Sequence, residues 1–315
     1  MNTLIARFAA ARAAFTAVGA DPVRADPVRA DSVSARPARG PLAAAAVTAA
    51  AVALVAAGDS SAAHAIGASL VAGAATGLGA AVLLPMRRLD ERRLGVFIAL
   101  GGGMMLAAAI WSLLLPAWAL SGVPMRLDIV VAGMAGWFAM RWLDERLPHR
   151  HPSSPVTTAA IDRAGPTQAL RLMVVAIAAH NLPEGFAVGA GFGGGDALGW
   201  VTALSIAIQN VPEGMIVAAA LAGLGASRPA AAVGALASGL VEPVGAALGT
   251  VATGISALAL PVALALAGGA MLFVVFDELI PQTWRHARTS GSPAAAWAPF
   301  AVGFAAVAAL VGGIG

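Results

Sequence analysis

Nine apolar segments, each close to the ~20 residues needed to cross hydrocarbon, constrain this chain more than any other feature. They cover approximately residues 41–58, 66–86, 94–118, 127–143, 168–191, 199–224, 229–255, 258–281 and 294–314. Hydrophobic residues make up 59% of the chain and charged residues only 11%. Soluble domains contain roughly 25% charged residues, so this chain lacks the polar surface they need. The sequence therefore predicts an all-α, polytopic membrane protein.

The arginines predict on which side of the membrane each connection lies. All 19 basic residues are arginine, and the connections that hold them alternate along the chain. With the N-terminus in the cytoplasm, 18 of the 19 lie on cytoplasmic segments and only Arg126 faces outward. This asymmetry is the one that the positive-inside rule describes. We therefore expect a cytoplasmic N-terminus and an outer C-terminus.

The chain is expected to divide into an arm, an extra helix and a core. Residues 1–40 contain the repeat ADPVRADPVRADSV, which is typical of a disordered, basic cytoplasmic arm. Residues 41–65 are expected to form an additional transmembrane helix and its loop. The core is residues 66–315, with a hydrophilic cytoplasmic loop at 146–167. There is no cysteine, which excludes disulfides and thiolate sites, and no basic face with interleaved aromatics, which argues against nucleic acid as a partner.

Two six-residue motifs inside apolar segments are near copies of each other. The first is His180-Asn-Leu-Pro-Glu-Gly, and Gln209-Asn-Val-Pro-Glu-Gly follows 29 positions later. A glutamate at bilayer depth costs at least ~2.5 kcal/mol, so it needs a partner or a function. On a helix, His180 and Glu184 share a face, and Gln209 and Glu213 share a face of the next helix. Each motif thus offers a carboxylate with further ligand groups around it.

The ligand types in these motifs indicate a divalent cation site. Proline has no N–H, so Pro183 and Pro212 free backbone carbonyls within their helices. Imidazole, carboxylate and amide groups suit Zn²⁺, and also Fe²⁺, Mn²⁺ and Cd²⁺. Glu242, followed by another proline, is expected to form a third wall on the following helix. We therefore expect one shared pocket at mid-membrane, formed by His180, Glu184, Gln209, Glu213 and Glu242.

At these residues the sequence resembles the ZIP (Zrt-, Irt-like) family of divalent metal transporters, in particular its bacterial GufA-type branch. Further matching pieces are Gly239-Leu-Val-Glu-Pro-Val-Gly, Phe273-Val-Val-Phe-Asp-Glu-Leu-Ile-Pro and Gly103-Met-Met-Leu-Ala-Ala. The resemblance covers roughly residues 66–314. It implies an eight-helix ZIP core, here with one extra N-terminal transmembrane helix, and a binuclear metal site halfway across a bacterial inner membrane.

The resemblance also implies two ligand sets for that binuclear site. The first set is His180, Glu184, Gln209 and Glu213, with Met105 nearby, and the second is Asn181, Glu184, Asn210, Glu213 and Glu242. Some relatives have aspartate where this chain has Asn210, so the second set here carries less negative charge. An exit path on the cytoplasmic side is expected from Asp144, His149, His151, Asp277 and Glu278. The family often has histidine where this chain has Asp277.

The function predicted from these observations is import of Zn²⁺ and related divalent cations into the cytoplasm by alternating access. The expected partners are divalent metal ions and the lipid bilayer, and a homodimer is an assembly that the prediction leaves open. No phosphate loop of the G-x-x-x-x-G-K-[ST] type is present, so ATP hydrolysis by this chain is not expected. Two alternatives stay open: a metal-gated channel or metal sensor without carrier flux, and an intramembrane metalloenzyme. The sequence lacks the HExxH motif of zinc hydrolases, so we expect no enzyme.

Overall fold

The computed structural model describes residues 60–82, 84–85, 91–122, 126–147, 166–256 and 258–314. All of these residues belong to one compact unit within residues 40–315. The predicted N-terminal arm and the predicted extra helix at 41–58 lie outside the described residues. The described part of the chain is helical throughout and contains no β-strand, as the sequence predicts.

Eight helical segments make up the described residues. In chain order their elements are α3 (Ser60–Val82), α4 (Glu91–Ala107) with η1 (Ala108–Leu114) and α5 (Leu115–Leu120), α6 (Arg126–Asp144), α8 (Pro166–Gly193), α9 (Asp196–Gly223), α10 (Arg228–Gly239) with α11 (Glu242–Gly254), α12 (Ala259–Val274) with η3 (Val275–Leu279) and α13 (Ile280–Thr289), and α14 (Pro293–Ile314). The elements η1 and η3 are π-helical turns inside longer helices.

Seven of these segments are long and apolar enough to cross a membrane. The exception among the described segments is α6, which carries charged residues near both of its ends. Two boundaries differ from the predicted ones. The segment expected at 66–86 begins earlier, at Ser60, and the segment expected at 258–281 continues through η3 and α13 to Thr289. The chain is therefore a multi-pass helical membrane protein.

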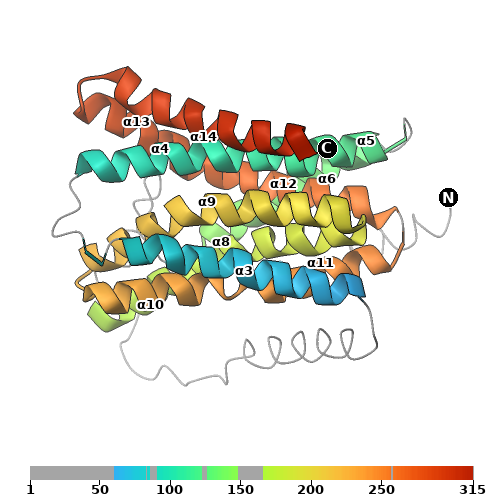
Figure 1. The fold of residues 1–315 in the computed structure, drawn as a ribbon, viewed down its shortest axis with the longest axis horizontal. Coiled ribbons are helices and arrows are strands. Elements are labelled where there is room, and N and C mark those ends of the chain that lie inside the picture. Colours follow the sequence, from blue (N-terminus) through green and yellow to red (C-terminus); the bar gives the residue numbers. More distant parts are fainter. Residues whose placement is uncertain are drawn as a thin grey trace, which may run out of the picture. The chain divides into compact units, whose positions relative to one another are not determined.

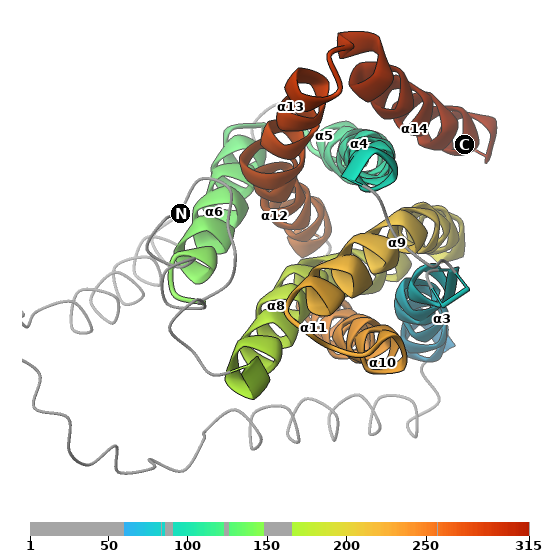
Figure 2. The same cartoon turned by 90° about the vertical axis from the view of Figure 1, so that its left-hand side faces the viewer.

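The helices form two groups, which Figures 1 and 2 show from two sides. In the first group, α3, α8, α9, α10 and α11 pack against one another. In the second group, α4, η1 and α5 pack with α12, η3, α13 and α14, and α6 packs along α12. The two groups meet mainly where α4 contacts α9 and where α12 contacts α8. Both sequence motifs lie in the first group, on the two helices that face the second.

Glycines let the helices of the first group approach backbone to backbone. A Cβ atom at Gly214 of α9 would overlap the carbonyl oxygen of Thr76 on α3, and one at Gly185 of α8 would overlap the backbone of Glu242. Small residues at such crossings are how membrane helices gain packing energy without a hydrophobic driving force. The glycine that ends each motif therefore fixes the distance between the helix that carries the motif and its neighbour.

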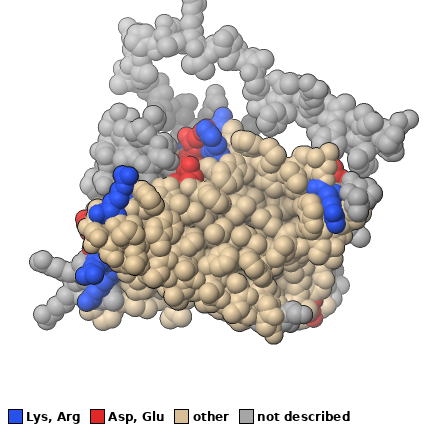
Figure 3. Space-filling view, turned by 90° about the horizontal axis from the view of Figure 1, so that it is seen from above, with Lys and Arg blue, Asp and Glu red and all other residues tan. Residues whose placement is uncertain are grey.

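The charged side chains lie mostly at the ends of the helices. In the face shown in Figure 3, Arg, Asp and Glu lie at the margins, and the broad surface between them is uncharged. Large apolar side chains on this protein are exposed, including Val71, Leu127 and Ile255. An uncharged flank with exposed aliphatic side chains is what contact with lipid requires.

The close crossing at Gly214 predicts a sharp difference between two glycine variants. Gly214→Ala should destabilise the protein by about 1–3 kcal/mol, because the added methyl group forces α3 and α9 apart. Gly67→Ala on α3 is the matched control, since nothing lies within 4 Å of the added atom. Thermal melting of the purified protein in detergent measures both. Equal melting temperatures for the two variants would show that this crossing is not tight in the native protein.

Candidate metal site

The two motifs lie within unbroken helices. His180, Asn181 and Glu184 belong to α8, and α8 continues through Pro183 without a break. The second motif lies in the same way on α9, which continues through Pro212.

The helix that carries Glu242 is built differently, because it is interrupted just before the acidic residue. Helix α10 ends at Gly239, and α11 begins at Glu242 after the two residues of a turn. Pro243 stands in the first turn of α11, a position where the missing N–H costs nothing and the fixed φ favours a helix start. In the structure this proline therefore begins a helix and does not kink one.

The first ligand set faces an internal cavity of about 330 Å³. His180 and Glu184 line it from α8, Gln209 and Glu213 line it from α9, and Met105 lines it from α4 in the second group. Along α9 the lining continues from Gln209 to Leu224, a rise of about 22 Å at 1.5 Å per residue. The cavity thus runs from the middle of α9 to the end that precedes Arg228.

A second polar cluster lies away from this cavity and is centred on Asn210 and Glu242. The Asn210 amide donates hydrogen bonds to Glu242 Oε1 at 2.6 Å and to the carbonyl oxygen of Ala72 at 2.9 Å. Asn210 and Glu242 are fully buried, as is Asn181 on α8. We call Asn210 and Glu242 the Asn210 cluster. None of Asn181, Asn210 and Glu242 lines the cavity, whereas the other four residues predicted to share a pocket with Glu242 all line it.

Glu184 and Glu213 lie between the cavity and the Asn210 cluster. Both side chains line the cavity. The carboxylates of Glu184 and Glu213 interact electrostatically with each other, and each of them also interacts with the carboxylate of Glu242. Three neighbouring carboxylates at bilayer depth repel one another strongly, because the surroundings screen charge poorly. A divalent cation between them removes that repulsion.

Buried ligand atoms without a hydrogen bond are concentrated in these two sets. Within the described residues, Glu184 Oε2, Gln209 Oε1, Asn210 Oδ1, Glu213 Oε2 and Glu242 Oε2 have no hydrogen-bond partner. The same is true of both side-chain polar atoms of Asn181. Buried polar groups in proteins are nearly always hydrogen-bonded, so such a concentration needs a physical reason. Oxygen atoms that converge and keep free lone pairs are available as metal ligands.

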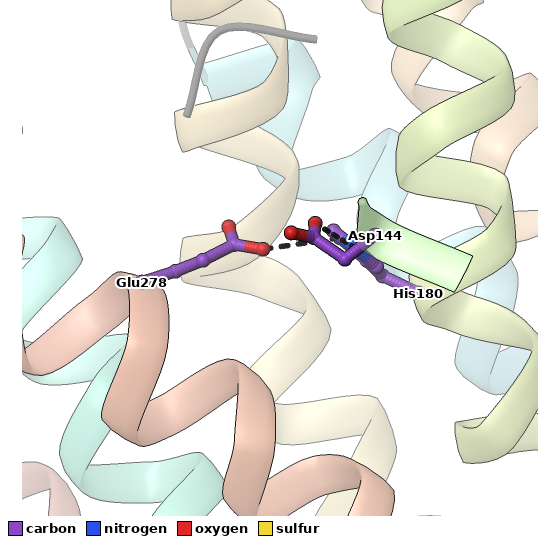
Figure 4. Close-up of side chains that lie close together, drawn as sticks. All are labelled: Asp144, His180 and Glu278. Atoms are coloured by element: carbon purple, nitrogen blue, oxygen red, sulfur yellow. Dashed lines mark ion pairs between the residues drawn. The ribbon is translucent and has the colours of Figure 1, made fainter. Parts of the chain in front are cut away.

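A third group of ligands joins the two helix groups at His180. Figure 4 shows the three side chains close together. His180 Nε2 is 3.5 Å from Asp144 Oδ1, and His180 Nδ1 is 3.6 Å from Glu278 Oε1. One ligand atom of each of the three residues lies within 4.8 Å of the others, close enough to hold one metal ion. Asp144 comes from the end of α6 and Glu278 from η3, so both carboxylates belong to the second helix group.

Two of the residues predicted to form the exit path belong to this third group of ligands. Asp144 and Glu278 are brought together beside His180, and Glu278 also lines the cavity. Asp277 is not among the three grouped ligands and does not line the cavity, since its neighbour in η3 takes that place. His149 and His151 lie outside the described residues.

The structure adds three cavity residues that the sequence reasoning missed. Met173 of α8, Met271 of α12 and Gln282 of α13 all line the cavity. Their spacing from the predicted site residues could have indicated them. Met173 lies seven residues before His180, Met271 lies seven residues before Glu278, and Gln282 lies four residues after Glu278. Each of these intervals returns to the same helix face. A search for chemistry-bearing side chains at these intervals from the motifs would have found them.

The fold and the site together define a class of protein: a multi-pass helical membrane protein whose interior presents metal-ligand side chains to a cavity. Comparison with known proteins gives the family. The family described as ZIP Zinc transporter matches residues 144–311. The chain belongs to the ZIP family, which is a family of transporters and not of enzymes.

Several curated bacterial proteins are similar over most of the chain. The zinc transporter GufA of Myxococcus xanthus is 39% identical over 227 residues, which is 69% of this chain and 87% of the relative. The zinc transporter ZIPB of Bordetella bronchiseptica is 37% identical over 247 residues, covering 73% of this chain and 75% of the relative. The zinc transporter ZupT of Enterobacter sp. strain 638 is 33% identical over 218 residues, covering 68% and 84%.

The hydrogen bonds of Asn210 predict a stability effect that does not depend on bound metal. Asn210→Ala leaves a buried carboxylate and a buried carbonyl without their donor, which should cost about 1–3 kcal/mol. The measurement is the melting temperature of protein stripped of metal with a chelator. Asp196→Asn is the control, since Asp196 and its partner His64 are both largely exposed and should contribute little. An unchanged melting temperature for Asn210→Ala would contradict the observed hydrogen-bond network.

Proposed function

We propose that this protein transports zinc across the membrane and that the ions pass through the cavity lined by His180, Glu184, Gln209 and Glu213. The observation that carries the proposal is the convergence of these four side chains, from two near-identical motifs, on one cavity. An imidazole, an amide and two carboxylates form a ligand set suited to a borderline divalent ion. Cd²⁺, Fe²⁺ and Mn²⁺ are further substrates compatible with these ligands. The three relatives described above are zinc transporters, which supports zinc as the main substrate.

The direction we propose is import into the cytoplasm of a bacterial cell, through its inner membrane. The arginine distribution supports a cytoplasmic N-terminus, a cytoplasmic connection at Arg228 and an outer C-terminus. The cavity extends along α9 toward that same connection. In this orientation the cavity extends from the ligand set toward the cytoplasmic end of the helices. Asp144 and Glu278, which flank His180, then lie on the path by which the ion leaves.

Alternating access follows from the division into two helix groups. The four principal ligands lie on α8 and α9 of the first group, whereas Met105, Asp144 and Glu278 lie on the second. Displacement of one group against the other would carry the ligands, with their ion, past a fixed wall. An inside-negative potential favours inward movement of a divalent ion by ~4.6 kcal/mol per 100 mV, twice the value for one charge. This driving force makes uptake feasible without ATP.

The sharpest test is removal of a carboxylate that the proposal makes indispensable. Glu184→Ala or Glu213→Ala should reduce zinc uptake into proteoliposomes to the background of empty vesicles, because the ion loses a charged ligand at the centre of the site. Glu145→Ala is the matched control: Glu145 is exposed, its partner is Arg141 one helical turn away, and uptake should be unchanged. Protein amount in the vesicles and saturation of the initial rate with zinc are measured together.

The outcomes separate the alternatives. Wild-type uptake by Glu184→Ala at equal protein amount would overturn the assignment of the site. Zinc binding without any flux in the wild-type protein would favour a sensor. Flux that does not saturate, with unitary conductance in a bilayer, would favour a channel over a carrier.

A further inference from the structure

A buried hydrogen bond joins the two helix groups at a point outside the cavity. The hydroxyl of Ser112, in the π-helical turn η1 of the second group, donates to the hydroxyl oxygen of Ser205 on α9 of the first group at 3.0 Å. Ser205 in turn donates to the carbonyl oxygen of Val201, one turn earlier on its own helix, at 2.8 Å. Both serines are almost completely buried. The three groups therefore form a directed chain of hydrogen bonds that begins on one helix group and ends on the other.

The residues around this chain are apolar. Ala109 and Leu113 of η1 and Ile206 of α9 belong to one buried hydrophobic cluster. A hydroxyl group buried among apolar side chains costs free energy unless it is hydrogen-bonded. Ser205 donates within its own helix and can keep that bond when the groups move, whereas the bond donated by Ser112 exists only while the two groups are in contact. Separation of the groups at this point therefore acts mainly on Ser112.

The serine pair lies beyond one end of the cavity. Neither serine lines the cavity. Ser205 comes one turn before Gln209, where the cavity lining of α9 begins, and Ser112 comes seven residues after Met105. From Gln209 the cavity extends the other way, toward the connection at Arg228. The pair is therefore on the side of the ligand set that, in the proposed orientation, faces the outside of the cell.

We propose that the hydrogen bond between Ser112 and Ser205 is a latch, which holds the outer side of the ligand set closed while the cavity extends toward the cytoplasm. The inference rests on the function proposed above, because alternating access is what requires the two groups to separate on the outer side. The latch has to open before an ion from outside can reach the ligand set between η1 and α9. Its place in a π-helical turn fits this role, since such turns are rare and occur mostly at functional sites.

The strength of such a latch suits a contact that must open in every transport cycle. A hydrogen bond between two uncharged groups changes an equilibrium constant by about three- to tenfold. Loss of this bond should therefore shift the balance between the two conformations without unfolding the protein. Removal of Ser112 takes away the donor and removal of Ser205 takes away the acceptor of the same bond. The effects of the two substitutions should therefore not add, which is the mark of a direct interaction.

The test uses a single introduced thiol, because the chain contains no cysteine. Ala109→Cys places the thiol in the buried layer of η1, three residues before Ser112. A membrane-impermeant maleimide is added outside spheroplasts that contain the full-length protein, and the rate of labelling is measured. Ser112→Ala in this background should raise the rate about three- to tenfold, because the outer side is open for a larger share of the time. Ser205→Ala should raise it equally, and the two together no further.

Two controls separate the latch from a general loosening of the protein. Ser238→Ala removes a buried hydroxyl whose hydrogen bond stays within α10, so it should leave the labelling of Ala109→Cys unchanged. Ala235→Cys places a second reporter in a buried position of α10. Its labelling should stay unchanged when Ser112→Ala is added.

Three results would each overturn the latch. The first is an unchanged labelling rate of Ala109→Cys after Ser112→Ala. The second is a comparable rise at Ala235→Cys, which would show that the whole protein has loosened. The third is a double variant whose effect is the product of the two single effects, because the serines would then act separately. Labelling needs no zinc flux, so failure here leaves the transport proposal standing, and the uptake assay with Glu184→Ala decides that proposal separately.

Discussion

The mutual repulsion of Glu184, Glu213 and Glu242 at bilayer depth is the constraint on which the rest of this structure depends. Each carboxylate costs free energy to bury, and the three interact with one another. No arginine contacts any of them in the described residues, and the groups around them include amides, an imidazole and the further carboxylate of Glu278. A permanent salt bridge to arginine would neutralise the carboxylates and weaken their affinity for a cation. Without such a partner, the carboxylates stay available to an ion that arrives and leaves.

The carboxylates can stay close together only if the helices that carry them are held firmly against their neighbours. Close backbone contacts at glycines hold these helices. Gly185 lies against the backbone of Glu242, and Gly214 lies against that of Thr76. Each motif ends in one of these glycines, so the residue that positions the helix follows directly after the carboxylate that the helix must present. Backbone contact also leaves little freedom for relaxation, because neither partner can move like a flexible side chain. The first helix group is therefore suited to move as one body against the second.

The sequence was sufficient for the helical class and for most helix positions, because apolar length and helical periodicity are local properties. It also singled out His180, Glu184, Gln209 and Glu213, which line one cavity in the structure. It did not show how separate helices pack. Glu242 was expected in one pocket with His180 and, from the family resemblance, in a ligand set with Asn210; it accepts a hydrogen bond from Asn210 and does not line the cavity. Asp144 and Glu278 were expected on an exit path, and the structure adds that both lie close to His180. This proximity joins residues far apart in the chain, which no local pattern encodes.

Helix geometry determines the direction in which each residue of the duplicated motif points. Adjacent residues on an α-helix point about 100° apart, so His180 and Asn181 cannot face the same space, and neither can Gln209 and Asn210. The first residue of each motif lines the cavity, and the second is fully buried and does not line it. The glutamate lies four residues after the first and three after the second, which places it between the two directions. One six-residue pattern, used on two neighbouring helices, thus presents its first residue and its glutamate to the cavity and turns its second residue away from it.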